Sequence, residues 1–235
     1  MIRIPFIFPM ILFLSIGNAQ TAKELCIKGN VKREIRDYKG AIACYSEALK
    51  KDPDNFEAYF NCGDVKELMQ DYEGAVADFN QATVIDPSDT EALYRRGIAK
   101  QFNEDFSGAI ADFTRLIEMD PNNSDAYKGR GNAKFFMQNC PGAIVDFTKA
   151  VELDPEDAET FFFRGVAKED MKDYPGAMDD YEKSIEIEPN YIEAYYIRGL
   201  MEIKLGQKEN GCRDLKKAGE LGSNQAFAKI KELCQ

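Results

Sequence analysis

The side chains that most often perform chemistry in enzymes are scarce in this sequence. It contains no histidine, the commonest general base and a common metal ligand. No nucleophile–base pair, glycine-rich phosphate loop or metal-ligand spacing is present. Asp64 and Glu67 lie one helical turn apart, but such carboxylate pairs are common on solvated helices. We therefore expect no enzymatic activity, no cofactor, no metal and no small-molecule substrate.

A more regular chemistry lies in two rows of opposite charge. The arginines are Arg96, Arg130, Arg164 and Arg198, and the aspartates are Asp78, Asp112, Asp146 and Asp180. Each arginine follows an aspartate by 18 residues, with a proline midway between them. Antiparallel helices joined at such a turn bring mirror-related residues together, which predicts salt bridges such as Asp78 with Arg96 from one helix pair to the next. A row of arginines that binds anions is the alternative interpretation.

Two pairs of cysteines show the same mirror relation. Cys44 and Cys62 are symmetric about Pro53, which predicts a disulfide in place of the ion pair. Cys212 and Cys234 are symmetric about residue 223, and their disulfide would stabilise the C-terminus by about 3 kcal/mol in the chain-entropy model. Two alternatives stay open at this stage. Cys44 pairs instead with Cys26, or the thiols stay free and buried, while Cys140 has no mirror partner.

An internal repeat of 34 residues positions all of these side chains. Its glycines are Gly29, Gly63, Gly97, Gly131, Gly165 and Gly199. Twelve residues after each glycine comes a small residue, and four residues later a large apolar one. The small residues are Ala41, Ala75, Ala109, Ala143, Ala177 and Gly211, and the large ones are Tyr45, Phe79, Phe113, Phe147, Tyr181 and Leu215. Small residues so spaced allow two antiparallel helices to approach closely while the large side chain fills the gap beside them.

Proline ends the first five units, at Pro53, Pro87, Pro121, Pro155 and Pro189. Because the residue before proline is disfavoured in helical geometry, each proline predicts a turn into the next unit. One unit is therefore one helical hairpin.

This pattern closely resembles the tetratricopeptide repeat, and the chain is identified as an exported, bacterial-type member with six repeats. The repeats are assigned to residues 22–55, 56–89, 90–123, 124–157, 158–191 and 192–225. Residues 226–235 continue as an amphipathic capping helix. The resemblance implies an all-α fold, a right-handed superhelical solenoid of antiparallel helix hairpins in which the first helix of each hairpin lines a concave groove.

What the resemblance implies for function is that a protein or peptide partner docks in this groove. The candidate groove residues are Asn30, Phe60, Asn61, Tyr94, Arg95, Lys128, Asn132, Phe162 and Tyr196. Aromatic rings dominate the set, and five such rings and stems can hold an extended or helical peptide. The alternative is that each ring packs on its own neighbours. Asn30, Asn61 and Arg95 also match part of a carboxylate clamp found in some family members, although Cys26 and Glu91 replace its lysines.

Residues 1–19 have the features of a signal peptide: Arg3, an apolar stretch and small residues before Gln20. We expect cleavage after Ala19, a periplasmic or secreted protein, and no stable membrane insertion of the mature chain, because the apolar stretch is shorter than the ~20 residues of a spanning helix. The formal net charge of −11 argues against nucleic acid as a partner.

The sequence thus predicts an exported scaffold that binds a protein or peptide in its groove. The alternative is a structural component of an envelope complex that assembles through an acidic convex face.

Overall fold

The computed structural model describes the backbone of residues 8–234 and the side chains of residues 21–234. Within residues 8–234 the chain forms 13 helices and no strand, which confirms the predicted all-α class of helical hairpins. It divides into two compact units, and the division between Leu116 and Ile117 falls near the end of the sixth helix.

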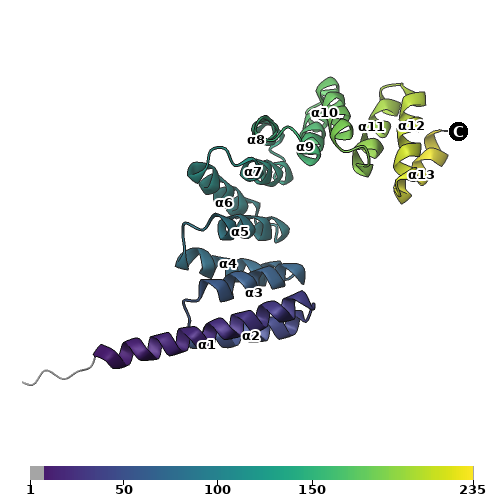
Figure 1. The fold of residues 1–235 in the computed structure, drawn as a ribbon. Coiled ribbons are helices and arrows are strands. Elements are labelled where there is room, and N and C mark those ends of the chain that lie inside the picture. The colour runs from purple at the N-terminus through teal and green to yellow at the C-terminus, as the bar shows by residue number, and fades with distance from the viewer. Residues whose placement is uncertain (1–7, 235) are drawn as a thin grey trace, which may run out of the picture. The chain divides into compact units, whose positions relative to one another are not determined.

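The first unit consists of three hairpins (Figure 1). Its helices are α1 (Phe8–Glu34), α2 (Tyr38–Lys51), α3 (Phe56–Leu68), α4 (Tyr72–Ile85), α5 (Thr90–Phe102) and α6 (Phe106–Met119). Odd-numbered helices are the first of each hairpin and even-numbered helices are the second.

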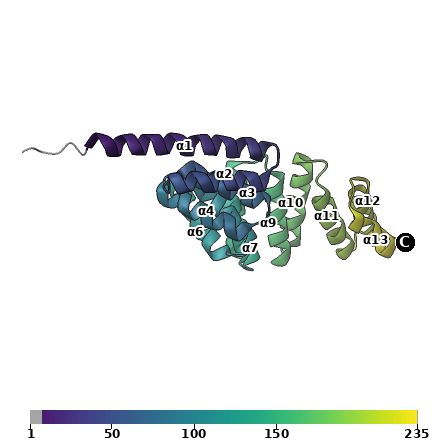
Figure 2. The same ribbon diagram turned by 90° about the horizontal axis from the view of Figure 1, so that it is seen from below.

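The second unit contains three further hairpins and a final helix. Its helices are α7 (Ser124–Phe136), α8 (Cys140–Leu153), α9 (Ala158–Asp170), α10 (Tyr174–Ile187), α11 (Ile192–Lys204), α12 (Lys208–Glu220) and α13 (Asn224–Leu233). The helix α13 lies against α12, as Figure 2 shows at the C-terminal end of the chain.

Short polar side chains begin most of these helices. Asp71 accepts a hydrogen bond from the amide of Gly74 at the start of α4, and Asn55 accepts one from Ala58 at the start of α3. Such caps satisfy amides that have no partner within the helix. The turn inside each of the first five hairpins contains one residue with positive φ, and these residues are Arg36, Gln70, Glu104, Gln138 and Lys172.

Close contact between glycine and an aromatic ring builds the core of each hairpin. A Cβ atom on Gly63 would lie 2.9 Å from the Phe79 ring, and one on Gly165 would lie 2.7 Å from the Tyr181 ring. Phe79 and Tyr181 are fully buried. The predicted packing of small residues against large ones is therefore confirmed, and it fixes the distance between the two helices of a hairpin.

The predicted salt bridges between successive hairpins are wrong, because the ion pairs form inside each hairpin. Nε of Arg96 donates to Asp112 over 2.8 Å, and Nε of Arg164 donates to Asp180 over 2.9 Å. Arg130 pairs with Asp146, and Arg198 pairs with Asp214. Partners are thus 16 residues apart and symmetric about the turn within the hairpin. The aspartate row faces the first helix of its own hairpin, so the pairs of Asp78 with Arg96, Asp146 with Arg164 and Asp180 with Arg198 do not form.

The cysteines follow the same logic. Cys212 and Cys234 form the predicted disulfide, with Cα atoms 5.7 Å apart, and it joins α12 to α13. Cys44 and Cys62 are free thiols, as is Cys26, so both predicted pairings of Cys44 are wrong. Burial raises the pKa of Cys62 to about 12, and Asp78 of the same hairpin raises it further. Cys62 thus occupies the position of the arginines in later hairpins and faces Asp78 rather than Cys44.

The predicted signal peptide, residues 1–19, lies outside the residues whose side chains the structure describes. Its cleavage after Ala19 and the resulting localisation stay predictions. Among the described helices, none has the length and hydropathy needed to cross a membrane.

Candidate functional site on the first helices

The first helices of successive hairpins contact one another within each unit. In the first unit α1 contacts α3 and α3 contacts α5, and in the second unit α7 contacts α9. We call the surface that these helices present the first-helix face of each unit. All nine predicted groove residues lie on first helices.

The predicted aromatic residues of this face pack edge-on against the core. The ring centroids of Phe60 and Phe79 are 5.8 Å apart, and those of Tyr94 and Phe113 are 5.9 Å apart. Phe60 and Tyr94 stay half-buried, so part of each ring faces solvent. Phe162 packs on Tyr181 and is only 8% exposed, so it is a core residue more than a contact surface. The face therefore offers ring edges in place of a continuous aromatic strip.

Charged residues of the first unit bind one another across successive first helices. Asp64 of α3 accepts from Arg33 of α1 over 2.7 Å and also pairs with Arg95 of α5. Arg95 lies 3.5 Å from Glu67 as well. The expected carboxylate-binding role of Arg95 is thus met inside the protein by two acidic side chains. The spacing of 31 residues from Arg33 to Asp64 and from Asp64 to Arg95 is the sequence signal that would have revealed this network.

The two asparagines of the expected clamp are also engaged or buried. The hydroxyl of Tyr45 donates to Oδ1 of Asn30 over 2.7 Å, and Nδ2 of Asn30 donates to Glu57 over 3.4 Å. Asn61 is only 8% exposed. Little of the resemblance to a carboxylate clamp survives in this geometry.

Burial also acts on a carboxylate of this network. Desolvation raises the pKa of Glu67 above its ordinary value, against the opposing effect of Arg95. Asp64 and Glu91 add to the rise because they place further negative charge nearby. The carboxylate pair Asp64 and Glu67 therefore belongs to an ion-pair network that holds α1, α3 and α5 together, and it is not a paired acid and base.

In the second unit, Lys128 of α7 is bound by acidic residues of α9. Its Nζ lies 3.0 Å from Asp157 and 3.3 Å from Glu159. Burial alone would lower the pKa of Lys128, but these two carboxylates prevail and raise it. Asn132, one turn further along α7, keeps its side-chain oxygen buried without a hydrogen-bond partner among the described residues. Tyr196 of α11 is half-buried.

A recess of about 470 Å³ opens beside these residues where α9 and α11 begin. Its lining consists of Glu159, Glu188, Asn190, Tyr191, Ile192 and Glu193. Tyr191 stacks obliquely on Phe162, with ring centroids 5.2 Å apart. Three carboxylates and one aromatic ring give this recess the chemistry to receive a basic side chain.

Sequence reasoning missed Tyr191. It occupies the helix-cap position that is filled by Asn55, Asp89, Asn123 and Asp157 in the preceding hairpins. Tyr191 makes no capping hydrogen bond with its side chain. An aromatic residue in place of a cap is the signal that would have found it.

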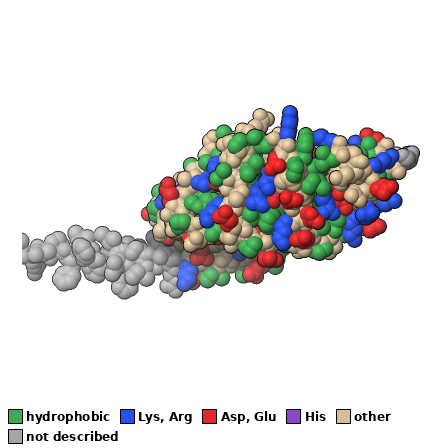
Figure 3. Space-filling view, turned by 90° about the horizontal axis from the view of Figure 1, so that it is seen from above, with side chains coloured by type: hydrophobic (Ala, Val, Ile, Leu, Met, Phe, Trp, Pro, Cys, Tyr) green, Lys and Arg blue, Asp and Glu red, His purple; other side chains and the backbone are tan. Residues whose placement is uncertain are grey.

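The wider surface is mixed in character. On the face seen in Figure 3, acidic and basic side chains are interspersed, and hydrophobic side chains are exposed among them. This face carries no large area of a single charge.

Three models of the tetratricopeptide repeat family match this sequence. They cover residues 29–70, 94–135, and both 56–89 and 158–191, which together make up more than half of the chain. The chain is a tetratricopeptide repeat protein. No curated protein sequence matches it.

Several solved structures are similar to this tetratricopeptide protein. MamA is 27% identical over 70% of this chain and 96% of its own chain, with a TM-score of 0.62. A tetratricopeptide repeat protein from Parabacteroides merdae is 24% identical over 90% of this chain and 82% of its own, with a TM-score of 0.67. YrrB, described as a TPR protein with an unusual peptide-binding site, is 20% identical over 80% of this chain and 98% of its own, with a TM-score of 0.61. The last two show the shared fold.

Tetratricopeptide repeats generally serve as scaffolds without catalytic activity, and the family match supports a role in protein interaction here.

Proposed function

We propose that this protein is an exported scaffold that binds a protein or peptide partner on its first-helix face, and that the partner carries basic residues. The observation that supports this most strongly is the acidic recess at the start of α9 and α11, where Tyr191 lies among Glu159, Glu188 and Glu193. A lysine or arginine side chain fits this environment because a ring face and carboxylates both attract a cation.

Much of the rest of the first-helix face is engaged inside the protein. Arg95 and Lys128 are each bound by two or more carboxylates, so neither offers a free positive charge to an acidic partner. The exposed acids at the helix starts, such as Glu193, are therefore the charges available for recognition. This favours a basic partner over an acidic one.

The test is crosslinking and capture of partners from the native compartment with matched charge reversals. Glu193→Lys changes the recess, whereas Glu186→Lys changes an exposed acid on α10, a second helix. We expect Glu193→Lys to remove most of the captured partner and Glu186→Lys to leave it unchanged. The opposite result would favour assembly through the second-helix surface, which is the alternative function predicted from the sequence.

Export is the second part of the proposal. The disulfide between Cys212 and Cys234 supports it, because disulfides form and persist in oxidising compartments. Mass spectrometry of the protein recovered outside the cytoplasm is expected to find Gln20 as its first residue. A cytoplasmic protein that keeps residues 1–19 would contradict export without affecting the proposed binding face.

A further inference from the structure

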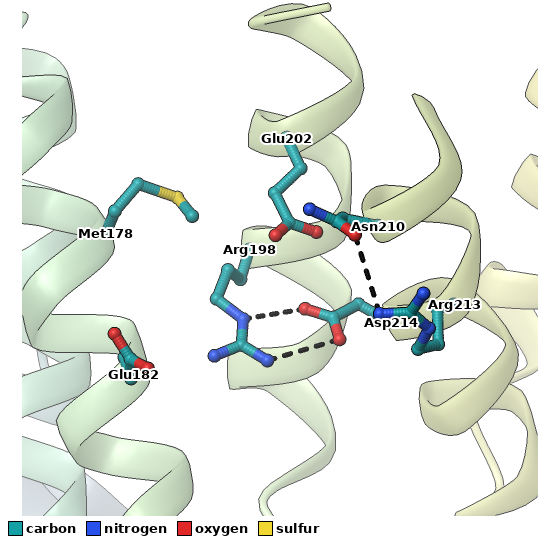
Figure 4. A pocket seen from close by; sticks show the side chains of 7 residues that line it. All are labelled: Met178, Glu182, Arg198, Glu202, Asn210, Arg213 and Asp214. Carbon is teal, nitrogen blue, oxygen red and sulfur yellow. Dashed lines mark hydrogen bonds and ion pairs between the residues drawn. The ribbon is translucent and has the colours of Figure 1, made fainter. Parts of the chain in front are cut away.

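A second polar cavity lies between α10, α11 and α12, away from the recess described above (Figure 4). It has a volume of about 260 Å³. Its lining consists of Met178, Glu182, Arg198, Glu202, Asn210, Arg213 and Asp214. The other hairpins show what normally fills this position.

In the fifth hairpin a lysine occupies the equivalent space. Nζ of Lys168 lies 2.7 Å from Oδ2 of Asp180 and donates to the carbonyl oxygen of Gly176 over 3.3 Å. The same arrangement recurs at Lys66 with Asp78 (2.7 Å), Lys100 with Asp112 (2.8 Å) and Lys134 with Asp146 (2.7 Å). In the third, fourth and fifth hairpins an arginine completes the set, so one aspartate receives two cations.

In the sixth hairpin the lysine is replaced by Glu202. Arg198 still holds Asp214 by two contacts, of 2.6 Å and 3.2 Å, so the aspartate keeps the orientation seen in the other hairpins. The ammonium group that would approach Asp214 from α11 is absent, and a second carboxylate stands in its place. Glu202 is only 8% exposed, and its Oε2 has no hydrogen-bond partner among the described residues.

The charges around the cavity do not balance. Glu182, Glu202 and Asp214 contribute three negative charges, and Arg198 and Arg213 contribute two positive charges. The excess is one negative charge, which one monovalent cation neutralises. Figure 4 shows the Glu202 carboxylate facing the cavity beside Asn210, while Met178 forms an apolar wall on α10.

We propose that this cavity binds the primary ammonium group of an alkylamine in the position that lysine occupies in the other hairpins. The carboxylates of Glu202 and Asp214 would accept its N–H bonds, and the Asn210 carbonyl oxygen would replace that of Gly176. Met178 would contact the methylene groups that follow. A cavity of about 260 Å³ suits a single side chain or a short amine better than a drug-sized ligand. The site lies apart from the first-helix recess and does not depend on the proposed function.

The electrostatics of Glu202 agree with this geometry. Burial raises the pKa of Glu202, and the nearby Asp214 raises it further. A bound ammonium group would stabilise the charged form of both carboxylates. The rival explanation is a protonated Glu202 that needs no ligand, and the experiment separates the two.

The experiment is an NMR titration of the full chain with ¹³C-labelled methionine methyl groups, using the Met178 resonance as the probe. The ligand is n-butylammonium chloride, compared with sodium chloride and tetramethylammonium chloride at equal ionic strength. We expect a saturable shift with butylammonium only, since tetramethylammonium has no N–H bond to donate. Equal shifts with all three cations, or none, would leave Glu202 as an unliganded acid and overturn the proposal.

Variants connect this binding to Glu202. We expect Glu202→Gln to weaken butylammonium binding at least tenfold, because it removes the charged acceptor. Glu202→Lys restores the side chain of the other hairpins, which should fold normally and abolish binding. Glu186→Gln, on α10 but outside the cavity, should leave the dissociation constant unchanged. Unchanged binding in Glu202→Gln would also sink the assignment.

The source of the amine is identified by a second titration. Nα-acetyl-lysine amide represents a lysine of a partner protein, and butylammonium represents a free amine. Tighter binding of the lysine compound, with no shift from Nα-acetyl-norleucine amide, would indicate a protein-borne lysine. Tighter binding of butylammonium would indicate a free alkylamine.

Discussion

The fifth and sixth hairpins share one backbone plan but hold their helices together in different ways. In the fifth, Asp180 lies between Arg164 and Lys168 and receives both cations. In the sixth, Asp214 lies beside one arginine and Glu202, and a cavity opens next to them. The residue with positive φ in the turn also changes, from Lys172 to Gly206.

This difference teaches that the repeat tolerates charge inversion at a buried position when other constraints hold the hairpin together. The disulfide between Cys212 and Cys234 ties the second helix of the sixth hairpin to α13. Fixed in this way, the sixth hairpin retains its packing without the lysine. The fifth hairpin has no such covalent constraint and relies on its three-residue ion cluster.

The largest expected effect is the loss of Asp180. Asp180→Ala leaves Arg164 and Lys168 without their shared partner, and both are mostly buried, so we expect a loss of about 4 kcal/mol. Asp214→Ala leaves one arginine beside Glu202, which takes over part of the neutralisation, so a loss of about 1 kcal/mol is expected. Hydrogen exchange of α9–α10 and α11–α12 peptides measures the two losses. Equal losses would contradict the comparison.

Next in size is the disulfide. Cys234→Ser opens a loop whose ends are 22 residues apart, and the chain-entropy model predicts a loss of about 3 kcal/mol. We expect the loss to appear as faster exchange in α12 and α13, with α9 and α10 unchanged. Treatment of the variant with a reductant should add nothing, since the other four cysteines are free. A loss spread evenly over the second unit would show that the disulfide does not act locally.

A smaller effect concerns pH. Because the pKa of Glu202 in the folded state lies above its ordinary value of 4.5, the folded state binds the proton more tightly than the unfolded state. The stabilisation from Glu202 is therefore present below pH 4.5 and is lost as the pH rises through the raised pKa. Glu202→Gln removes this dependence, so we expect it to match the parent protein in acid and exceed it by about 1 kcal/mol at neutral pH.

Urea denaturation at several pH values measures this difference between parent and variant. The matched control is Glu186→Gln, which changes an exposed acid and should keep a constant difference from the parent. A constant difference for Glu202→Gln as well would show that Glu202 does not titrate abnormally.

The smallest effect lies at the turns. Lys172 adopts a φ of 65°, which is unfavourable for a residue with a Cβ atom, so Lys172→Gly should gain about 0.5 kcal/mol. Gly206 adopts a φ of 85°, and Gly206→Lys should lose about 1 kcal/mol. Lys172→Ala retains the strain and is the control for loss of the lysine side chain. Thermal melting of the three variants gives the order, and a gain in Lys172→Ala would indicate a side-chain effect.

Much of the fold could be predicted from the sequence because its signals are local and periodic. Gly165 and Tyr181 lie 16 residues apart on helices joined by a short turn, and their close contact follows from that spacing. The disulfide between Cys212 and Cys234 followed from symmetry about a turn in the same way. The family resemblance added the solenoid class.

The ion pairs show where this reasoning fails. Asp180 is symmetric with Arg164 about one turn and with Arg198 about another, so spacing alone offered both partners. The rotation of each helix about its own axis turns Asp180 toward α9, and that rotation is set by packing of the whole hairpin. The same rotation separates Cys44 from Cys62.

The sequence by itself determined the helices, their turns and the hairpin repeat, because glycine, proline and apolar periodicity act over a few residues. Only the tertiary structure decided which charges meet, which groove rings are buried, and which position lost its cation. Glu202 looks in the sequence like one more surface acid, yet it lies buried beside Asp214 without a hydrogen-bond partner for Oε2 among the described residues. Burial and the direction of a side chain depend on neighbouring helices, and a linear spacing does not contain them.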